Sequence, residues 1–394
     1  MSTRDLDAYS PLKATRHLDI VEGVRLGWPA RPAHVQVILS DTCNHSCFFC
    51  AYRDPAYTSS QLFYEVREGA GGLRRDADHP ERDYNPRRQI PYDKVIEILD
   101  DCVEMKVSGV QLTGGGEPTT HPDFARILQA TIERGLPFSL VTNGTLLANK
   151  PELLKLVARA AWVRVSLDAG RADTYARTRG VGPQAFDKVC AAITGLDLAR
   201  RDAGTACVLG VGYVVTPENW QEVGEATALV KRLGADNIRV SAQFSSEDEK
   251  LFAECHDRAA SVCRAAETLA DERFQVYNRF GAKLDDLRQH RPNFGLCGYQ
   301  YFTTYIGANL DVYRCCVIAY NERGRIGSLA AVPGASGALG ISGRRFKDFW
   351  MDDERAGEMA AFDPKTCDRC QFTGINRILD YVLRVDDPPH SEFV

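Results

Sequence analysis

Short apolar runs, many of them β-branched, alternate with amphipathic segments between residues 35 and 245. The apolar runs are typical of buried strands, and the segments between them have the periodicity of helices that cover one face of a sheet. We expect strands at Val35–Ser40, Gly109–Thr113, Phe138–Thr142, Trp162–Leu167, Val208–Val215 and Asn237–Gln243. We expect helices at Tyr92–Lys106, Pro122–Arg134, Pro151–Arg159, Ala185–Arg200 and Pro217–Leu233. Several of these begin with Pro and stop at Gly, which is the usual asymmetry of helix ends.

This alternation predicts an α/β fold with a parallel sheet and right-handed crossovers. Six strand and helix units are fewer than the eight of a closed barrel, so we expect a partial (βα)6 TIM-like barrel over residues 35–245. Its functional loops should lie at the C-terminal ends of the strands. The other predicted parts are an N-terminal extension (1–34), a helical connector (246–296), a small α+β module (297–375) and a C-terminal tail (376–394).

Composition and charge narrow the class of protein. The formal net charge of the 394-residue chain is −5, which attracts neither nucleic acid nor an anionic membrane. No apolar run is long enough for a membrane span, and the N-terminus lacks the apolar region of a secretion signal. We therefore expect a cytoplasmic protein. The long, polar segment 51–91 after the first strand is predicted to be a loop or lid.

The chain has 13 cysteines, and close spacing of cysteines in a reducing compartment indicates metal or redox chemistry. Five lie singly and are predicted to be small buried hydrophobic residues: Cys102, Cys190, Cys207, Cys255 and Cys263. The other eight cluster at 43/47/50, 297, 315/316 and 367/370.

The first cluster, Cys43, Cys47 and Cys50 in "DTCNHSCFFC", directly follows the first predicted strand. Three thiolates do not fill the four positions of a tetrahedral zinc site or of a four-iron cluster. One reading is a zinc site completed by His45 or by a distant residue. The other is a metal centre with one open position, where a substrate or cofactor coordinates.

The spacing CxxxCxxC, with Phe49 before the last cysteine, resembles the cluster-binding signature of the radical S-adenosylmethionine (radical SAM) superfamily. The resemblance implies that the three cysteines hold three irons of a [4Fe–4S] cluster and that S-adenosylmethionine (SAM) chelates the fourth. It also implies cleavage of SAM to a 5′-deoxyadenosyl radical that abstracts hydrogen from a substrate.

The stretch "QLTGGGEPTTHP", after the second predicted strand, resembles the GGE motif of the same family. The resemblance implies that Gly114, Gly115, Gly116 and Glu117 engage the amino group of the bound methionine moiety. Glycines let the main chain approach a ligand closely, and a carboxylate suits an ammonium group.

Two later strand ends resemble other cofactor-contacting segments of the family. Asn143 in "VTNGTLL" is a candidate for the cofactor pocket, and Ser166 and Asp168 in "VRVSLDAG" are candidates for the ribose or carboxylate of SAM. Arg177 or Arg179 is expected to add a charge partner. Each of these residues is also compatible with an ordinary polar position at a strand end.

The later cysteines, Cys297, Cys315 or Cys316, Cys367 and Cys370, form a second set of four. Four thiolates can close either a zinc site or a [4Fe–4S] cluster. Their order resembles the twitch or SPASM appendage of radical SAM enzymes, which implies one auxiliary [4Fe–4S] cluster. The register favours Cys315 as the ligand, although Leu310 and Arg314 stand where the family usually has Gly and Pro.

The resemblance implies a radical SAM oxidoreductase. We expect oxidation (dehydrogenation) of a small polar metabolite, with the auxiliary cluster as electron acceptor and flavodoxin or ferredoxin as electron donor. About 34 residues precede the first strand, too few for a fused leader-peptide domain. The alternatives are cross-linking or epimerisation of a ribosomally made peptide, and a non-catalytic iron–sulfur or zinc scaffold. We expect neither a membrane nor nucleic acid as a partner.

Overall fold

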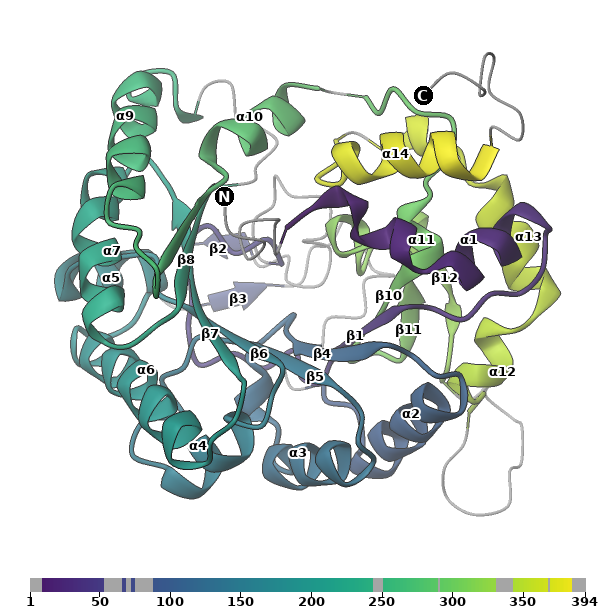
Figure 1. Ribbon diagram of the computed structural model, residues 1–394, viewed down its shortest axis with the longest axis horizontal. Coiled ribbons are helices and arrows are strands. Elements are labelled where there is room, and N and C mark those ends of the chain that lie inside the picture. Colours follow the sequence, from purple (N-terminus) through teal and green to yellow (C-terminus); the bar gives the residue numbers. More distant parts are fainter. Residues whose placement is uncertain are drawn as a thin grey trace.

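The computed structural model describes residues 9–52, 66–68, 72–74, 88–243, 251–289, 291–330, 343–367 and 369–384. Their main feature is a ten-stranded sheet that curves around a central axis (Figure 1). The strand order is β12-β11-β10-β1-β4-β5-β6-β7-β8-β9. All six predicted strands are present, parallel and in the predicted order: β1 (His34–Ile38), β4 (Gly109–Thr113), β5 (Phe138–Thr142), β6 (Trp162–Ser166), β7 (Val208–Val215) and β8 (Asn237–Ala242).

The helices between these strands cover the outer face of the sheet (Figure 1). They are α2 (Tyr92–Glu104), α3 (Phe124–Glu133), α4 (Pro151–Val157), α5 (Ala172–Arg179), α6 (Gln184–Asp202) and α7 (Val223–Arg232), the last preceded by the short η4 (Trp220–Glu222). All five predicted helices are confirmed to within a few residues. Helix α5 was not predicted, because its sequence "ADTYARTR" is mostly polar and has no apolar stripe.

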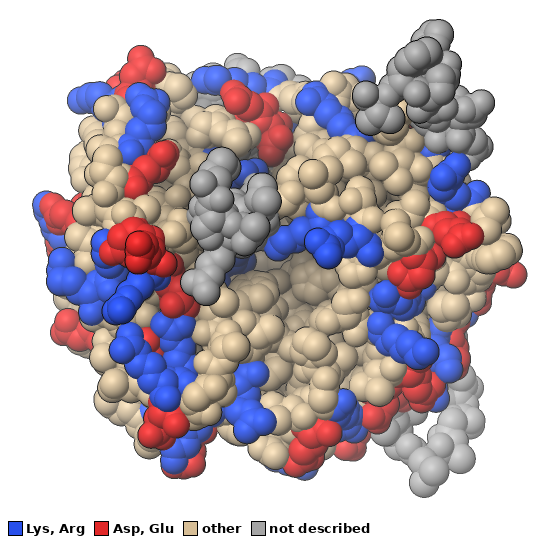
Figure 2. Space-filling model, in the orientation of Figure 1, with Lys and Arg blue, Asp and Glu red and all other residues tan. Residues whose placement is uncertain are grey.

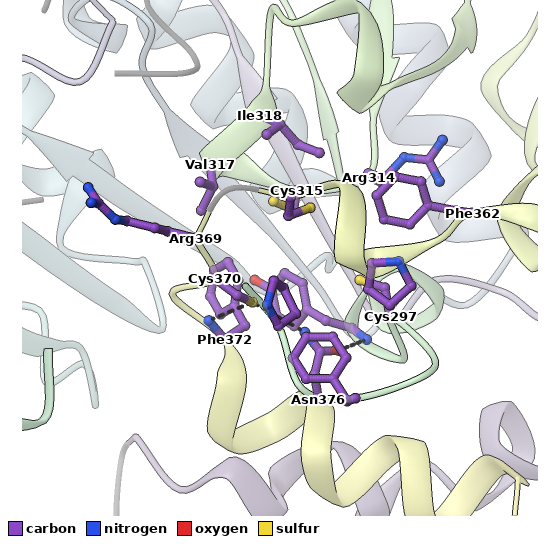
Figure 3. Close-up of a pocket in the computed structure, with 15 residues that line it drawn as sticks. Cys297, Arg314, Cys315, Val317, Ile318, Phe362, Arg369, Cys370, Phe372 and Asn376 are labelled. Carbon is purple, nitrogen blue, oxygen red and sulfur yellow. Dashed lines mark hydrogen bonds between the residues drawn. The ribbon is translucent and has the colours of Figure 1, made fainter. Parts of the chain in front are cut away.

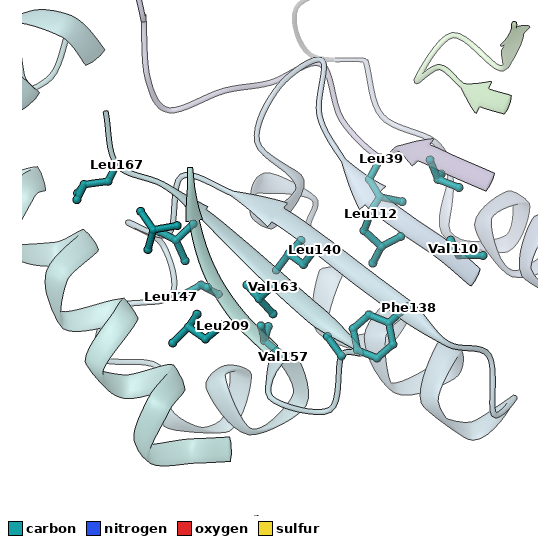
Figure 4. Packing of buried hydrophobic residues seen from close by; sticks show 14 of the residues in the cluster. Leu39, Val110, Leu112, Phe138, Leu140, Leu147, Val157, Val163, Leu167 and Leu209 are labelled. Carbon is teal, nitrogen blue, oxygen red and sulfur yellow. The ribbon is translucent and has the colours of Figure 1, made fainter. Parts of the chain in front are cut away.

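Alternate residues of each strand pack against these helices. Val163 and Val165 of β6 are buried in the main hydrophobic core with Leu140 and Leu209 of the neighbouring strands (Figure 4). Because side chains alternate across a strand, Trp162, Arg164 and Ser166 face the concave inner side of the sheet. The outer face is therefore apolar, and the inner face carries polar and charged side chains.

The C-terminal part of the chain extends the same sheet at both edges. Helices α9 (His256–Glu267) and α10 (Phe280–Arg288) flank β9 (Gln275–Asn278), which pairs in parallel with β8. At the other edge, β10 (Thr303–Ile306) pairs in parallel with β1, and β11 (Asp311–Tyr313) and β12 (Arg325–Ser328) follow antiparallel. The predicted connector thus contains a strand, and the strands of the predicted C-terminal module belong to the barrel sheet. Within the described residues the sheet stays open, with β9 and β12 as its edges.

The two chain ends pack together beside this second edge (Figure 1). The N-terminal extension forms η1 (Pro11–Arg16) and α1 (Leu18–Arg25), and α11 (Tyr299–Phe302), α12 (Phe346–Trp350), α13 (Asp353–Ala361) and α14 (Thr373–Arg384) follow later. Ile20 of α1 and Leu379 of α14 are fully buried in one small apolar cluster. The predicted C-terminal tail at 376–394 is therefore wrong at its start, since its first nine residues lie inside α14.

Within the predicted loop at 51–91, the described residues include a two-stranded antiparallel ladder of β2 (Val66–Glu68) and β3 (Gly72–Arg74). The rest of that prediction falls largely outside the described residues. In the part of the chain that the structure describes, no helix has the length and apolar character needed to cross a membrane.

Candidate functional site

The first cysteine loop follows β1 and is held by the end of α5. The backbone N–H of Ser46 donates to the carbonyl of Arg179 at 2.9 Å, and that of Phe48 to the carbonyl of Thr178 at 3.3 Å. Gly180 ends α5 in the left-handed conformation with φ of 60°, and a Cβ there would lie 2.5 Å from the carbonyl oxygen of Ser46. A helix that the sequence did not reveal thus shapes the loop, and the Gly after Arg179 was the signal for its end.

The three cysteines of this loop are half-buried and not in disulfides. The N–H of His45 points to Sγ of Cys43 at 3.4 Å, and Nη1 of Arg179 donates to Sγ of Cys47 at 3.4 Å. Hydrogen-bond donors aimed at sulfur favour the thiolate, which is the form that binds iron. The donor set of the loop therefore fits a cluster. The imidazole of His45 instead lies 3.3 Å from Oγ1 of Thr145 and packs edge-on against the ring of Tyr175.

The glycine run after β4 lies directly against the start of the cysteine loop. The N–H of Gly116 donates to the carbonyl of Ser40 at 2.9 Å, and that of Glu117 to the carbonyl of Thr42 at 2.8 Å. A Cβ on Gly116 would lie 2.1 Å from the Thr42 oxygen, and one on Gly115 would lie 2.9 Å from Oδ1 of Asp41. Gly114 is equally restricted, because its Cβ would lie 1.5 Å from the Gly116 oxygen. Gly116 is thus required by the close approach of two backbone segments, Gly115 by the Asp41 side chain, and Gly114 by the tight turn of the glycine run itself.

The Glu117 carboxylate is buried and accepts four hydrogen bonds within the protein. Its Oε1 accepts from the N–H of Thr119 at 3.2 Å and from the hydroxyls of Thr119 and Thr142 at 2.7 and 2.6 Å. Its Oε2 accepts from the N–H of Asn143 at 2.7 Å. Burial raises the pKa of Glu117, and the hydrogen bonds oppose that shift. The carboxylate therefore fixes the end of β5 to the glycine run.

Asn143 extends this network back to the cysteine loop. Its Nδ2 donates to Oδ1 of Asn44 at 2.8 Å, and its Oδ1 accepts from the N–H and hydroxyl of Thr145 at 3.0 and 2.7 Å. Asn44 in turn donates to the Thr145 hydroxyl at 2.9 Å. The structure thus brings the cysteine loop, Glu117 and Asn143 together at the C-terminal ends of the strands.

Asp168, just after β6, and Arg179, the last residue of α5, complete this group of residues. Arg179 forms a buried ion pair with Asp168, whose Oδ1 accepts from the N–H of Val214 at 2.6 Å. Burial raises the pKa of Asp168, and the charge of Arg179 opposes that shift. Ser166 lies half-buried at the end of β6. Arg177 points elsewhere, to Asp173 at 3.1 Å on the exposed side of α5, so Arg179 is the arginine that lies at the site.

The second cysteine set lines one pocket between the C-terminal segments (Figure 3). Cys297, Cys315, Cys367 and Cys370 all contribute to its wall, and Cys316 does not. The N–H of Phe372 donates to Sγ of Cys370 at 3.3 Å. The side-chain amide of Asn376 donates to the same sulfur at 3.6 Å.

The cysteines of this pocket raise one another's pKa. The pKa of Cys297 is raised to about 12 by burial and then by the charges of Cys370 and Cys367, and that of Cys367 is raised to about 11 by burial and then by Cys370. Four cysteines that become thiolates here need a positive partner, which either a zinc ion or an iron cluster can supply. Among the described residues, no group of three or more His, Cys, Asp or Glu side chains has the arrangement for a single metal ion. A four-iron cluster takes one thiolate on each iron, so its ligands need not converge on one point.

Tyr52, two residues after Cys50, packs on an apolar cluster that Cys316 also contacts. The pKa of Tyr52 is raised well above its usual value by burial first, and then by the charges of Cys316, Cys50, Asp41 and Cys315. The ring of Tyr52 meets that of Tyr320 edge-on, with 6.0 Å between centroids. The end of the cysteine loop and the segment of Cys316 and Tyr320 thus pack on one apolar cluster, a contact that nothing in the local sequence signals.

Comparison with known proteins identifies the class. The profile of the radical SAM superfamily matches residues 37–230, which hold the cysteine loop, the glycine run and the strand ends described above. Residues 37–230 thus match a radical SAM domain, and that family implies a [4Fe–4S] cluster and SAM as cofactors. The residues present fit both.

Two relatives illustrate the range of similar proteins. An AdoMet-dependent heme synthase of Methanosarcina barkeri is 31% identical over 153 residues, 38% of this chain and 41% of that protein, so the match spans less than half of that relative. The mycofactocin maturase MftC of Mycolicibacterium smegmatis is 25% identical over 73% of this chain and 68% of its own length.

Among solved structures, SuiB of Streptococcus suis bound to the precursor peptide SuiA is similar in fold. The TM-score is 0.55 at 15% identity, over 90% of this chain and 73% of that one. The fold prediction is confirmed: this is an α/β protein whose mostly parallel sheet forms a partial TIM barrel.

Proposed function

We propose that this radical SAM enzyme is an oxidoreductase that dehydrogenates a small polar metabolite held inside the partial barrel. The observation that supports the proposal is the packing of Tyr52, two residues after Cys50, on the same apolar cluster as Cys316, with its ring against that of Tyr320. A substrate near this contact would have the radical source on one side and the electron acceptor on the other. When bound, the cluster and SAM supply the 5′-deoxyadenosyl radical that abstracts hydrogen.

The residues at the barrel edge have distinct roles in this proposal. Cys43, Cys47 and Cys50 are the thiolate ligands, and Arg179 donates to Cys47 while it is paired with Asp168. We expect Arg179, Asp168 and Ser166 to contact the carboxylate or ribose of SAM. Glu117 positions the glycine run and Asn143 through its four internal hydrogen bonds. It is therefore not the sole group that acts on the ammonium group of SAM.

The second cysteine set supports net oxidation. Four thiolates from Cys297, Cys315, Cys367 and Cys370 would occupy every iron of an auxiliary cluster, which leaves no iron for a substrate. Such a cluster is suited to accept the electron that remains on the substrate radical. Flavodoxin or ferredoxin is the proposed donor for the first cluster.

A second candidate function is modification of a precursor peptide. Its support is the fold similarity to SuiB, a protein crystallised with its precursor peptide, over 90% of this chain. Both candidates use the same radical chemistry and differ in what enters the barrel.

Isotope transfer tests the proposed chemistry and separates the two candidates. The anaerobically reduced protein is given SAM and a deuterium-labelled cell extract that has been divided into a metabolite fraction and a peptide fraction. We expect deuterium in 5′-deoxyadenosine with the metabolite fraction. Deuterium transfer only with the peptide fraction would favour the second candidate, and transfer with neither would contradict both.

The auxiliary cluster has its own test. We expect two reduced cluster signals in electron paramagnetic resonance, of which only one changes when SAM is added. The variant Cys367→Ser should lose the signal that does not respond. A single cluster signal in the wild-type protein would contradict the oxidation proposal.

A further inference from the structure

Strand β7 presents glycines to the inside of the barrel. Leu209 and Val211 are buried on the helix side, so Gly210 and Gly212 face inward. A Cβ on Gly212 would lie 3.4 Å from Cδ and 4.0 Å from Nε of Arg164, which places the Arg164 side chain across β7. Gly212 is paired with Arg239 of β8. Because Gly212 has no side chain, the two arginines from β6 and β8 can approach each other.

Neither arginine has an acidic partner among the described residues. The Arg164 guanidinium lies over the ring of Trp162 at 5.4 Å, and that of Arg239 lies over the ring of Tyr9 at 5.8 Å. Nε of Arg239 is buried without a hydrogen bond. Asp168, whose charge reaches Arg239, already forms an ion pair with Arg179.

The positive charges of the arginine side chains in this part of the barrel repel one another. The pKa of Arg239 is lowered to about 10, first by the charge of Arg164 and then by burial, and Arg279 adds to the effect. Several other buried or partly buried arginines of this chain are paired with acids, such as Arg88 with Asp41 and Arg200 with Asp236. Two adjacent guanidinium groups without a counter-ion are costly unless an anion joins them.

Arg164 lies deeper in the barrel than the cofactor residues, whereas Arg239 is level with Ser166 through their shared neighbour Gly212. Arg164 precedes Ser166 on the inner face of β6, so it lies about 7 Å below the strand end. Figure 2 shows that the molecule is hollowed at its centre, inside the ring of strands seen in Figure 1, and that Lys and Arg side chains gather at the rim of the hollow.

We propose that Arg164 and Arg239 bind a carboxylate or phosphate group of the substrate inside the barrel. Both groups accept the paired N–H donors of guanidinium. The rings of Trp162 and Tyr9 lie against the two guanidinium groups. The assignment of the bound anion to the substrate rests on the proposed function. The binding of an anion at these two residues does not rest on it.

The test uses the reconstituted holoenzyme and two probes, inorganic phosphate and succinate, at constant ionic strength with chloride as the reference anion. We expect a saturable rise of the thermal midpoint with one probe or both, accompanied by a change in Trp fluorescence that is lost in Trp162→Phe. The probe that gives the stronger response identifies the class of anion. No saturable response to either probe would overturn the proposal.

Substitution of the arginines separates binding from a structural role. In Arg164→Met and Arg239→Met, the response should weaken at least tenfold, while the midpoint in chloride stays the same or rises because repulsion is relieved. The exposed Arg159→Met is the control and should respond like the wild type. An unchanged response in both variants, or a lower chloride midpoint in both, would contradict the inference. If a Met variant fails to fold, Arg164→Lys and Arg239→Lys keep the charge but not the paired donors, and an unweakened response in them would also count against it.

SAM cleavage distinguishes this inference from the proposed function. The Met variants should still form 5′-deoxyadenosine when reduced with SAM and no substrate. A protein that binds the probes through the arginines but never cleaves SAM would contradict the proposed function alone. A protein that cleaves SAM but binds the probes equally well without the arginines would contradict this inference alone.

Discussion

The hydroxyl of Tyr320 donates a hydrogen bond to Oδ1 of Asp41 at 2.7 Å, although 279 positions separate the two residues in sequence. Asp41 is 1% exposed and precedes the cysteine loop, and its Oδ2 accepts from Nε of Arg88 at 3.0 Å. The Tyr320 hydroxyl also accepts from the N–H of Ala308. The start of the first cysteine loop is thus held by the C-terminal segment that carries the second cysteine set.

Loss of this bond should destabilise the protein and the cysteine loop. Tyr320→Phe leaves a buried carboxylate oxygen without its donor, and we expect a loss of about 1–3 kcal/mol in the free energy of unfolding. Urea denaturation of the metal-free protein measures it. The matched control is Tyr381→Phe, whose side chain is exposed and should show no change beyond error. Equal stabilities of the two variants would show that the Tyr320 bond contributes nothing.

Close backbone approach makes Gly116 intolerant of any side chain. In Gly116→Ala the new Cβ would lie 2.1 Å from the Thr42 oxygen, so the glycine run and the cysteine loop must separate. We expect loss of about four irons per chain after reconstitution and no SAM binding. Gly224→Ala, in α7 with nothing within 4 Å of the new Cβ, is the control and should keep its full iron content. Normal iron and SAM binding in Gly116→Ala would refute this reading of the glycine run.

The two adjacent cysteines at the pocket should differ in their effect on iron content. Cys315 lines the pocket and Cys316 does not, so Cys315→Ser should reduce iron from about eight to about four per chain and Cys316→Ser should leave it near eight. Iron and sulfide analysis after anaerobic reconstitution measures this. The reverse result would exchange the two assignments, and zinc in place of the lost iron would overturn the cluster assignment.

Burial of His34 predicts a pH dependence of stability. Its pKa is lowered to about 4 by burial at the start of β1, so the folded state keeps it neutral. Below pH 6.5 the unfolded chain takes up a proton that the folded chain does not, and stability falls as the pH drops towards 4. Between pH 7.5 and 5.5 we expect a loss of about 1 kcal/mol from this residue.

The matched variant is His34→Gln, which cannot take up the proton. Urea denaturation of the metal-free wild type and variant at both pH values isolates the contribution of this one residue. The wild type should lose more stability than the variant on acidification. A parallel loss in both proteins would show that His34 is not held neutral by the fold.

Much of the barrel could be predicted because its signals are local. The apolar run of β4 and the amphipathic pattern of α2 each depend on a few neighbouring residues, and both elements formed where expected. The edges of the sheet could not be predicted, because the pairing of Val35 with Thr304 joins segments far apart in the chain and leaves no local pattern.

Some features of the candidate site could likewise be predicted from local sequence, and others could not. The cysteine spacing and the strand-end polar residues were visible in the sequence, and the structure gathers Glu117, Asn143 and Arg179 around the loop. The function of Glu117 as an internal acceptor was not visible, since only the fold shows that Thr142 and Asn143 donate to it. Tyr320 and Arg239 carried no sequence signal, because their importance comes from partners on other elements.

Cleavage of SAM tests the central claim most directly. The anaerobically reconstituted and reduced protein is incubated with SAM, and 5′-deoxyadenosine is measured, with Cys47→Ala as the matched variant. The account predicts 5′-deoxyadenosine from the wild type and none above background from Cys47→Ala. No 5′-deoxyadenosine from a wild-type protein that holds its full complement of iron, or equal amounts from both proteins, would contradict it.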